Sequence, residues 1–167
     1  MSIRTFARAA LLLAATALLA SSASAANETA AAASSERPTF GPRIGISSSP
    51  DQLVLGGQVT FPDFAPHLSV SPNVELGFLD NETTVAINAD FDYHFEVKSQ
   101  WKPYAGAGAA LVVTQPSSGS SSTDAGLNLI GGAAVPTRTG NQFFGELRIG
   151  LGDIASVKLI AGWNFSM

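Results

Sequence analysis

The chain has no cysteine among its 167 residues. This absence excludes disulfide bonds, thiolate metal ligands and a lipid anchor on cysteine. Charged residues are also scarce, at 13% of the chain, and basic residues are outnumbered 9 to 13 by acidic ones. An acidic chain is a poor partner for nucleic acid. Stability and any attachment to a membrane must therefore come from the fold itself.

Long apolar runs are missing outside the N-terminus, where Ala9–Ala20 follows Arg4 and Arg8. This run is shorter than the roughly 20 residues of a transmembrane helix, and it leads to the small-residue sequence Ala23-Ser24-Ala25. We predict a signal peptide over residues 1–25, with an uncleaved anchor as the alternative. Cleavage would remove both arginines and leave one domain-sized chain with 7 basic and 13 acidic residues.

Helical periodicity is absent from the rest of the chain. Residues 26–40 are rich in Ala and Ser, which predicts a flexible N-terminal tail. From residue 41 onward, strand-like runs alternate with short segments rich in turn residues. The eight runs are Arg43–Ile46, Leu53–Phe61, Leu68–Leu79, Thr84–Val97, Tyr104–Thr114, Ala125–Val135, Phe143–Leu151 and Val157–Ser166. Connections this short predict hairpins and therefore an antiparallel up-and-down meander.

The run Val85–Val97, VAINADFDYHFEV, alternates apolar and polar residues throughout. Such alternation predicts one β-strand with two different faces. The run is more than twice as long as the usual strand of roughly 5–6 residues, but it suits a tilted strand that crosses a bilayer. Closure of eight such strands would remove the exposed sheet edges. We therefore predict an all-β, eight-stranded antiparallel transmembrane barrel over residues 41–167, with lipid outside and polar groups inside.

Alternation by itself does not decide which face is inside. A soluble periplasmic lipid-binding barrel would use the same pattern with its apolar face inward. Two features favour the membrane version if the N-terminus starts in the periplasm. The longest connection, Gln115–Asp124, would be extracellular, and aromatic residues would lie near the membrane interfaces, mostly on the periplasmic side. These aromatic residues are Phe61, Phe64, Trp101, Tyr104, Phe143, Trp163 and Phe165. The strand Tyr104–Thr114 is apolar on both faces, so its lipid face is not assigned.

Two short segments carry a resemblance to a known family. WKPYAGAGAAL at 101–111 resembles the Pro-Tyr-x-Gly-x-Gly strand of small outer-membrane barrels of the OmpA/OmpX/OmpW type, and LIAGWNFSM at 159–167 resembles their last strand. Members of that family commonly end on an aromatic residue, whereas here Phe165 is followed by Ser166 and Met167.

The resemblance implies a place in the bacterial outer membrane, with outer-membrane lipid and the barrel assembly machinery as partners. It also implies structural, adhesive or surface-interaction work, with no extracellular partner identified. Because side chains largely fill the interior of an eight-stranded barrel, we expect no wide pore. We predict no enzyme activity and no cofactor.

Polar residues on the inward parity would need partners inside such a barrel. We predict that they form a structural network in the lumen. The candidate residues are Arg43, Glu75, Asp90, Asp92, His94, Glu96, Glu146, Arg148 and Lys158. Other interpretations make His94 a proton acceptor or, with two neighbouring aspartates, a metal ligand. Spacings of two residues carry little specificity, and we predict neither a catalytic nor a metal site.

A second function class rests on His67-Leu68-Ser69. This segment resembles the His-x-Ser spacing of outer-membrane lipid A deacylases, in which a nearby base activates the hydroxyl. The spacing is common by chance, and in that family it lies near the C-terminal end of the chain. An outer-membrane lipid-modifying enzyme is therefore the alternative function.

Overall fold

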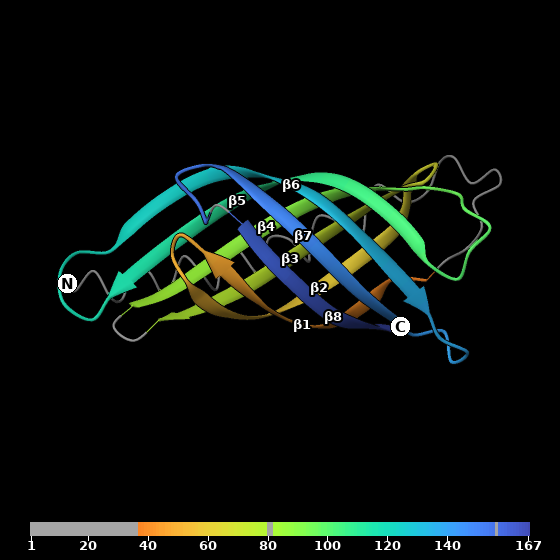
Figure 1. The fold of residues 1–167 in the computed structure, drawn as a ribbon, viewed down its shortest axis with the longest axis horizontal. Helices are drawn as coiled ribbons and strands as arrows, with labels where there is room; N and C mark the ends of the chain where they lie inside the picture. The colour runs from red at the N-terminus through yellow and green to blue at the C-terminus, as the bar shows by residue number, and fades with distance from the viewer. Residues whose placement is uncertain (1–36, 80–81, 156) are drawn as a thin grey trace, which may run out of the picture. The chain divides into compact units, whose positions relative to one another are not determined.

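The computed structural model describes residues 37–79, 82–155 and 157–167. These residues form a closed barrel in which every strand pairs antiparallel with the next, and β8 returns to pair with β1 (Figure 1). The strands are β1 (Thr39–Ser48), β2 (Gln52–Ala65), β3 (Leu68–Leu79), β4 (Glu82–His94), β5 (Lys102–Pro116), β6 (Ser122–Pro136), β7 (Gln142–Gly152) and β8 (Val157–Ser166). The predicted eight-stranded antiparallel barrel is confirmed. The described residues include no helix long and apolar enough to cross a membrane.

The two ends of the barrel differ in what they hold. One end, here called the terminal end, holds the start of β1, the end of β8 and the connections 66–67, 95–101 and 137–141. There the backbone N–H of Met167 donates to the carbonyl of Pro38 at 3.0 Å. The opposite end, called the distal end, holds the end of β3, the start of β4, the connections 49–51 and 117–121, and residues 153–155. The hairpin of β5 and β6 projects furthest at that end (Figure 1).

Strand boundaries differ from the predicted ones at several places. β1 begins at Thr39, so the last two residues assigned to the tail pair within the barrel. The predicted signal peptide and the tail as far as residue 36 lie outside the described residues. β4 ends at His94 instead of Val97, and residues 95–101 connect it to β5.

The prediction about the longest connection is wrong. β5 and β6 pair as far as Thr114 with Ser122, and β4 pairs Glu82 with Pro116, so the expected Gln115–Asp124 loop shrinks to residues 117–121. A backbone ladder needs only N–H and C=O groups, so polar residues extended these strands where side-chain composition indicated a loop. The longest connection by strand bounds is 95–101, at the terminal end.

Side chains alternate between a polar interior and an apolar outer surface. Arg43, Asn88 and Asp90 are among many polar residues buried inside, whereas large apolar side chains such as Ile46, Leu127 and Leu159 are about half exposed on the outside. A soluble lipid-binding barrel needs the reverse arrangement. The structure therefore has the inside-out polarity of a membrane barrel and excludes the soluble alternative.

The structure also assigns the faces of β5. Tyr104, Gly106 and Gly108 face the lumen, where the two glycines lie opposite Asp92 and Asp90 of β4. A Cβ atom at either glycine would overlap the facing aspartate carboxylate. Glycine at these two positions thus leaves the space that the buried carboxylates occupy.

Candidate functional site

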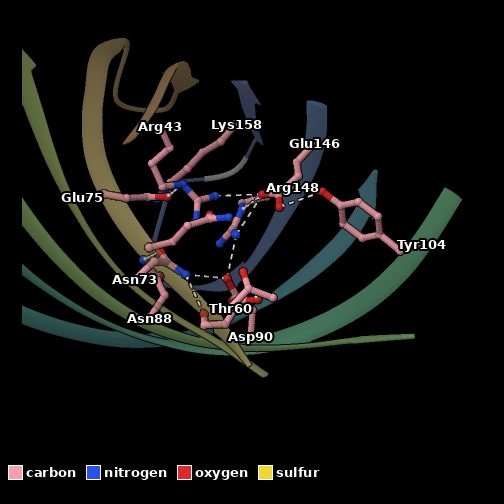
Figure 2. A network of polar contacts seen from close by, with 12 residues as sticks. Arg43, Thr60, Asn73, Glu75, Asn88, Asp90, Tyr104, Glu146, Arg148 and Lys158 are labelled. Atoms are coloured by element: carbon pink, nitrogen blue, oxygen red, sulfur yellow. Dashed lines mark hydrogen bonds and ion pairs between the residues drawn. The ribbon is translucent and has the colours of Figure 1, made fainter. Parts of the chain in front are cut away.

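The lumen contains a continuous network of charged side chains in the middle of the barrel. Arg148 on β7 lies at its centre, with Nη2 2.6 Å from Oδ2 of Asp90 and 2.9 Å from Oε2 of Glu146. Arg43 on β1 donates from Nη2 to the same Glu146 oxygen at 2.8 Å. Figure 2 shows these side chains converging from different strands. The strands are tied together across the lumen by two arginines that share one carboxylate.

The network continues toward the distal end through Glu75. Its Oε2 accepts a hydrogen bond from Nζ of Lys158 at 2.7 Å, and its Oε1 lies 3.4 Å from Nε of Arg43. Three bases and three carboxylates therefore alternate from Lys158 to Asp90, a balance that offsets the cost of burying each charge. All six residues are nine-tenths or more buried.

Amide and hydroxyl groups complete the network. Asn73 donates to Oδ2 of Asp90 at 2.6 Å and accepts from Asn88 at 2.8 Å. Gln58 accepts from Arg43 at 3.0 Å, and the hydroxyl of Tyr104 donates to Oε1 of Glu146 at 2.9 Å. None of these four is among the residues predicted from the sequence, because that prediction took only charged groups and histidine for the lumen. For Gln58, Asn73 and Asn88 the inward parity of their strands was the available signal. Tyr104 was expected near a membrane interface, but it is 7% exposed inside the barrel, and its strand has no polarity pattern that could have placed it there.

The structure places the predicted lumen residues in three groups. Six of them, Arg43, Glu75, Asp90, Glu146, Arg148 and Lys158, form the network. Asp92 and His94 also face the lumen but lie toward the terminal end: Asp92 is 5% exposed, and Nε2 of His94 lies 2.8 Å from the hydroxyl of Ser69. Oδ1 of Asp92 has no hydrogen-bond partner among the described residues.

Glu96 does not belong to the lumen. Its side chain is 85% exposed and lies 3.7 Å from Nδ1 of His67. The alternating pattern continued to Val97, but the strand ends at His94, so the inward parity does not reach Glu96.

The structure does not bring His67 and Ser69 together. The His67 ring packs against Tyr93, whose side chain is 46% exposed on the outer surface, at a centroid distance of 5.9 Å. Ser69 is 2% exposed, and its hydroxyl lies within hydrogen-bond distance of the His94 ring. His67 and Ser69 therefore lie on opposite sides of the barrel wall. Within the described residues, no group of three or more acidic, His or Cys side chains is arranged to hold a metal ion.

A cavity of about 340 Å³ lies above the network at the distal end. Glu75 and Lys158 line it, and Thr84 and Thr114 add hydroxyl groups. Ile154 packs with Ala86, Ala110 and Val112 at the same level. Glu75 and Lys158 form an ion pair at 2.7 Å, so the cavity borders directly on the ionic network.

Comparison with known proteins gives structural but no sequence-level matches. No family model matches the chain, and no curated protein matches it. The crystal structure of Neisserial surface protein A matches with a TM-score of 0.61 and 17% identity, over 78% of this chain and 96% of that one. The N-terminal β-barrel domain of Pseudomonas aeruginosa OprF matches with a TM-score of 0.64 and 14% identity, over 78% of this chain and 98% of that one. The chain has the fold of the small outer-membrane β-barrels. Identities this low establish the fold of the barrel and leave its specific role to be proposed.

Proposed function

We propose that this chain is a bacterial outer-membrane protein whose closed barrel supports its extracellular hairpins in a structural or surface-interaction role. The observation that carries the proposal is the polarity of the wall. Half-exposed Ile, Leu, Phe and Val side chains cover the outside, while a balanced ionic network fills the inside. Only a bilayer gives such an outer surface a favourable solvent.

Aromatic residues mark a membrane–water interface at the terminal end, which this proposal places in the periplasm. Phe143 and Trp163 form an outward pair at 6.1 Å, and Phe40 and Phe165 form another at 5.8 Å. Both pairs lie on strand segments near the terminal end. Aromatic side chains of this kind mark the membrane–water interface. The exposed rings of β8 are also available to the barrel assembly machinery.

The filled lumen supports a role without a wide pore. Arg148 is 1% exposed and Asp90 0%, and the ion pairs between them cross the lumen. Opening a path would break buried pairs, which costs several kcal/mol for each. We therefore propose that work on the cell exterior is done by the hairpins and the distal rim.

Heat-modifiability and carbonate extraction test the membrane location. The folded barrel in detergent should migrate differently before and after boiling, because its closed hydrogen-bond ladder resists detergent. The cellular protein should stay in the membrane pellet after carbonate washing. Identical mobility together with carbonate extraction would contradict the proposal.

Liposome swelling tests the closed lumen. Vesicles that hold the folded barrel should exclude small sugars as well as empty vesicles do. Sugar uptake at the rate of a general porin, measured on the same heat-modifiable sample, would contradict the closed lumen and leave the membrane location intact.

Ser69 takes no catalytic role in this proposal. Its hydroxyl is buried beside His94, where an acyl chain in the membrane has no access. Mass analysis of lipid A from cells with the parent chain and with Ser69→Ala should give the same species. Loss of an acyl chain only with the parent chain would favour the lipid-modifying enzyme.

A further inference from the structure

Charged residues outside the lumen are sorted between the two ends of the barrel. Four described basic residues lie outside the lumen, and all four are exposed. They are Arg37 before β1, Lys98 in the β4–β5 connection, Lys102 at the start of β5 and Arg138 in the β6–β7 connection. Each position belongs to the terminal end. Asp63 and Glu96 are the described acidic residues at that end, so it carries a positive excess.

The distal end has the opposite charge. Asp51, Glu82, Asp124 and Asp153 lie on or beside its connections. The basic residue of this half, Lys158, lies below the rim in its ion pair with Glu75. Among the described residues, the distal rim therefore has four carboxylates and no base. An anionic partner would be attracted to one end of this barrel and repelled from the other.

The basic residues lie at the depth of an aromatic interface. Trp101 is 62% exposed beside Lys102, and the outward Phe143–Trp163 pair lies just inside the connection that holds Arg138. Aromatic rings at this position rest at the level of the lipid headgroups, and long basic side chains nearby reach the same level. A basic ring at headgroup depth matches the phosphate of an anionic phospholipid.

We propose that Arg37, Lys98, Lys102 and Arg138, here called the basic collar, bind anionic phospholipid headgroups in the periplasmic leaflet. The collar sits where the apolar wall ends, so one lipid molecule can place its acyl chains on the wall and its phosphate on the collar. A cell-wall polymer is the other anionic partner on that side, but it offers nothing for the aromatic rings and the adjacent apolar wall. This inference rests on the proposed membrane location.

Native mass spectrometry of the folded barrel in detergent tests the collar. The barrel is titrated separately with phosphatidylglycerol and with phosphatidylcholine of the same acyl chains. The parent chain should prefer phosphatidylglycerol by at least about fivefold, because one basic residue near an anionic headgroup surface contributes attraction of about fivefold. The variant Arg37→Gln/Lys98→Gln/Lys102→Gln/Arg138→Gln should bind the two lipids within about twofold of each other.

A matched variant neutralises the same number of charges at the distal end. Asp51→Asn/Glu82→Gln/Asp124→Asn/Asp153→Asn should keep the preference of the parent chain. A change of equal size in this control would overturn the inference, because net charge and not the collar would then set the preference. Equal binding of both lipids by the parent chain would also overturn it.

Two further readouts separate the remaining outcomes. Each sample is first shown to be heat-modifiable, so failure to fold in a membrane mimic counts against the proposed function and not against the collar. Sedimentation with purified cell-wall sacculi is then measured. Collar-dependent sedimentation without a lipid preference would overturn the lipid assignment in favour of the cell wall.

Discussion

At the scale of single residues, the decisive feature is that each charge of the buried network has a partner on another strand. Asp90 illustrates this: Arg148 reaches it from β7 at 2.6 Å, and Asn73 reaches it from β3 at the same distance. Gly108 on β5 supplies the room that the carboxylate needs. Residues from three other strands thus hold this one buried aspartate, and each of these contacts can be tested separately.

Asp90→Leu should destabilise the barrel by about 3 kcal/mol, because it leaves Arg148 with one carboxylate fewer and Asn73 without its acceptor. Urea unfolding of the barrel refolded in lipid vesicles measures the change. Asp51→Leu in the exposed β1–β2 connection is the control and should be nearly neutral. Equal unfolding midpoints for the two variants would count against the buried network.

Gly108→Ala should destabilise the barrel by about 1–3 kcal/mol, the usual cost of overpacking. The added methyl group would overlap Oδ1 of Asp90 and lie 3.0 Å from the backbone oxygen of Ala89. Gly131→Ala is the matched control, since a Cβ there meets nothing within 4 Å. A smaller effect at Gly108 than at Gly131 would show that the Asp90 carboxylate does not fill the lumen space opposite β5.

At the scale of the strand, β4 has one face in the polar lumen and one face on the apolar outer surface. Its inward residues Asn88 and Asp90 are 1% and 0% exposed, while its outward neighbour Phe91 is 45% exposed. The alternation therefore separates two environments within one residue step. A polar substitution on the outer face should have a cost that depends on its depth in the bilayer.

Ala89→Arg should cost about 2–4 kcal/mol, because Ala89 faces outward near the middle of β4, where lipid surrounds the wall. Thr123→Arg, outward near the distal start of β6, should cost at most about 1 kcal/mol, since an arginine near the interface reaches water. Folding free energies in phospholipid vesicles compare the two. A lower cost at Ala89 would contradict its placement in the apolar zone.

At the scale of the whole molecule, the closed sheet fixes which connections share an end. Residues 117–121 lie at the distal end and 137–141 at the terminal end, and residues in both connections are exposed. With the termini in the periplasm, the two connections lie on opposite sides of the membrane. The orientation can therefore be measured with a pair of epitope insertions.

An epitope inserted after Gly119 should be tolerated and should be labelled on intact cells, because that exposed connection makes few contacts. The same epitope after Gly140 should be labelled only after permeabilisation. Both insertions must keep heat-modifiability for the comparison to count. The reverse labelling pattern would invert the proposed orientation.

The sequence by itself determined the number of strands, their order and the polarity of most of them. Period-two alternation is a local property, and in β4 and β8 it separates two faces without reference to any other strand. Short turn-rich connections then leave an antiparallel meander as the simple topology. Alternation failed at Glu96, and turn-residue composition failed at Gln115–Asp124. Both errors concern the end of a strand, which depends on how far the neighbouring strands continue the ladder.

Only the tertiary structure decided the partners of the buried charges and the faces of β5. Arg43 and Glu146 are 103 positions apart in sequence, and their contact follows from barrel closure and register. Tyr104, Gly106 and Gly108 form no polarity pattern of their own, so their inward direction is set by the aspartates opposite them. Which residues pair across a closed sheet depends on the register of strands that are distant in sequence. The local pattern of one strand therefore does not predict these contacts.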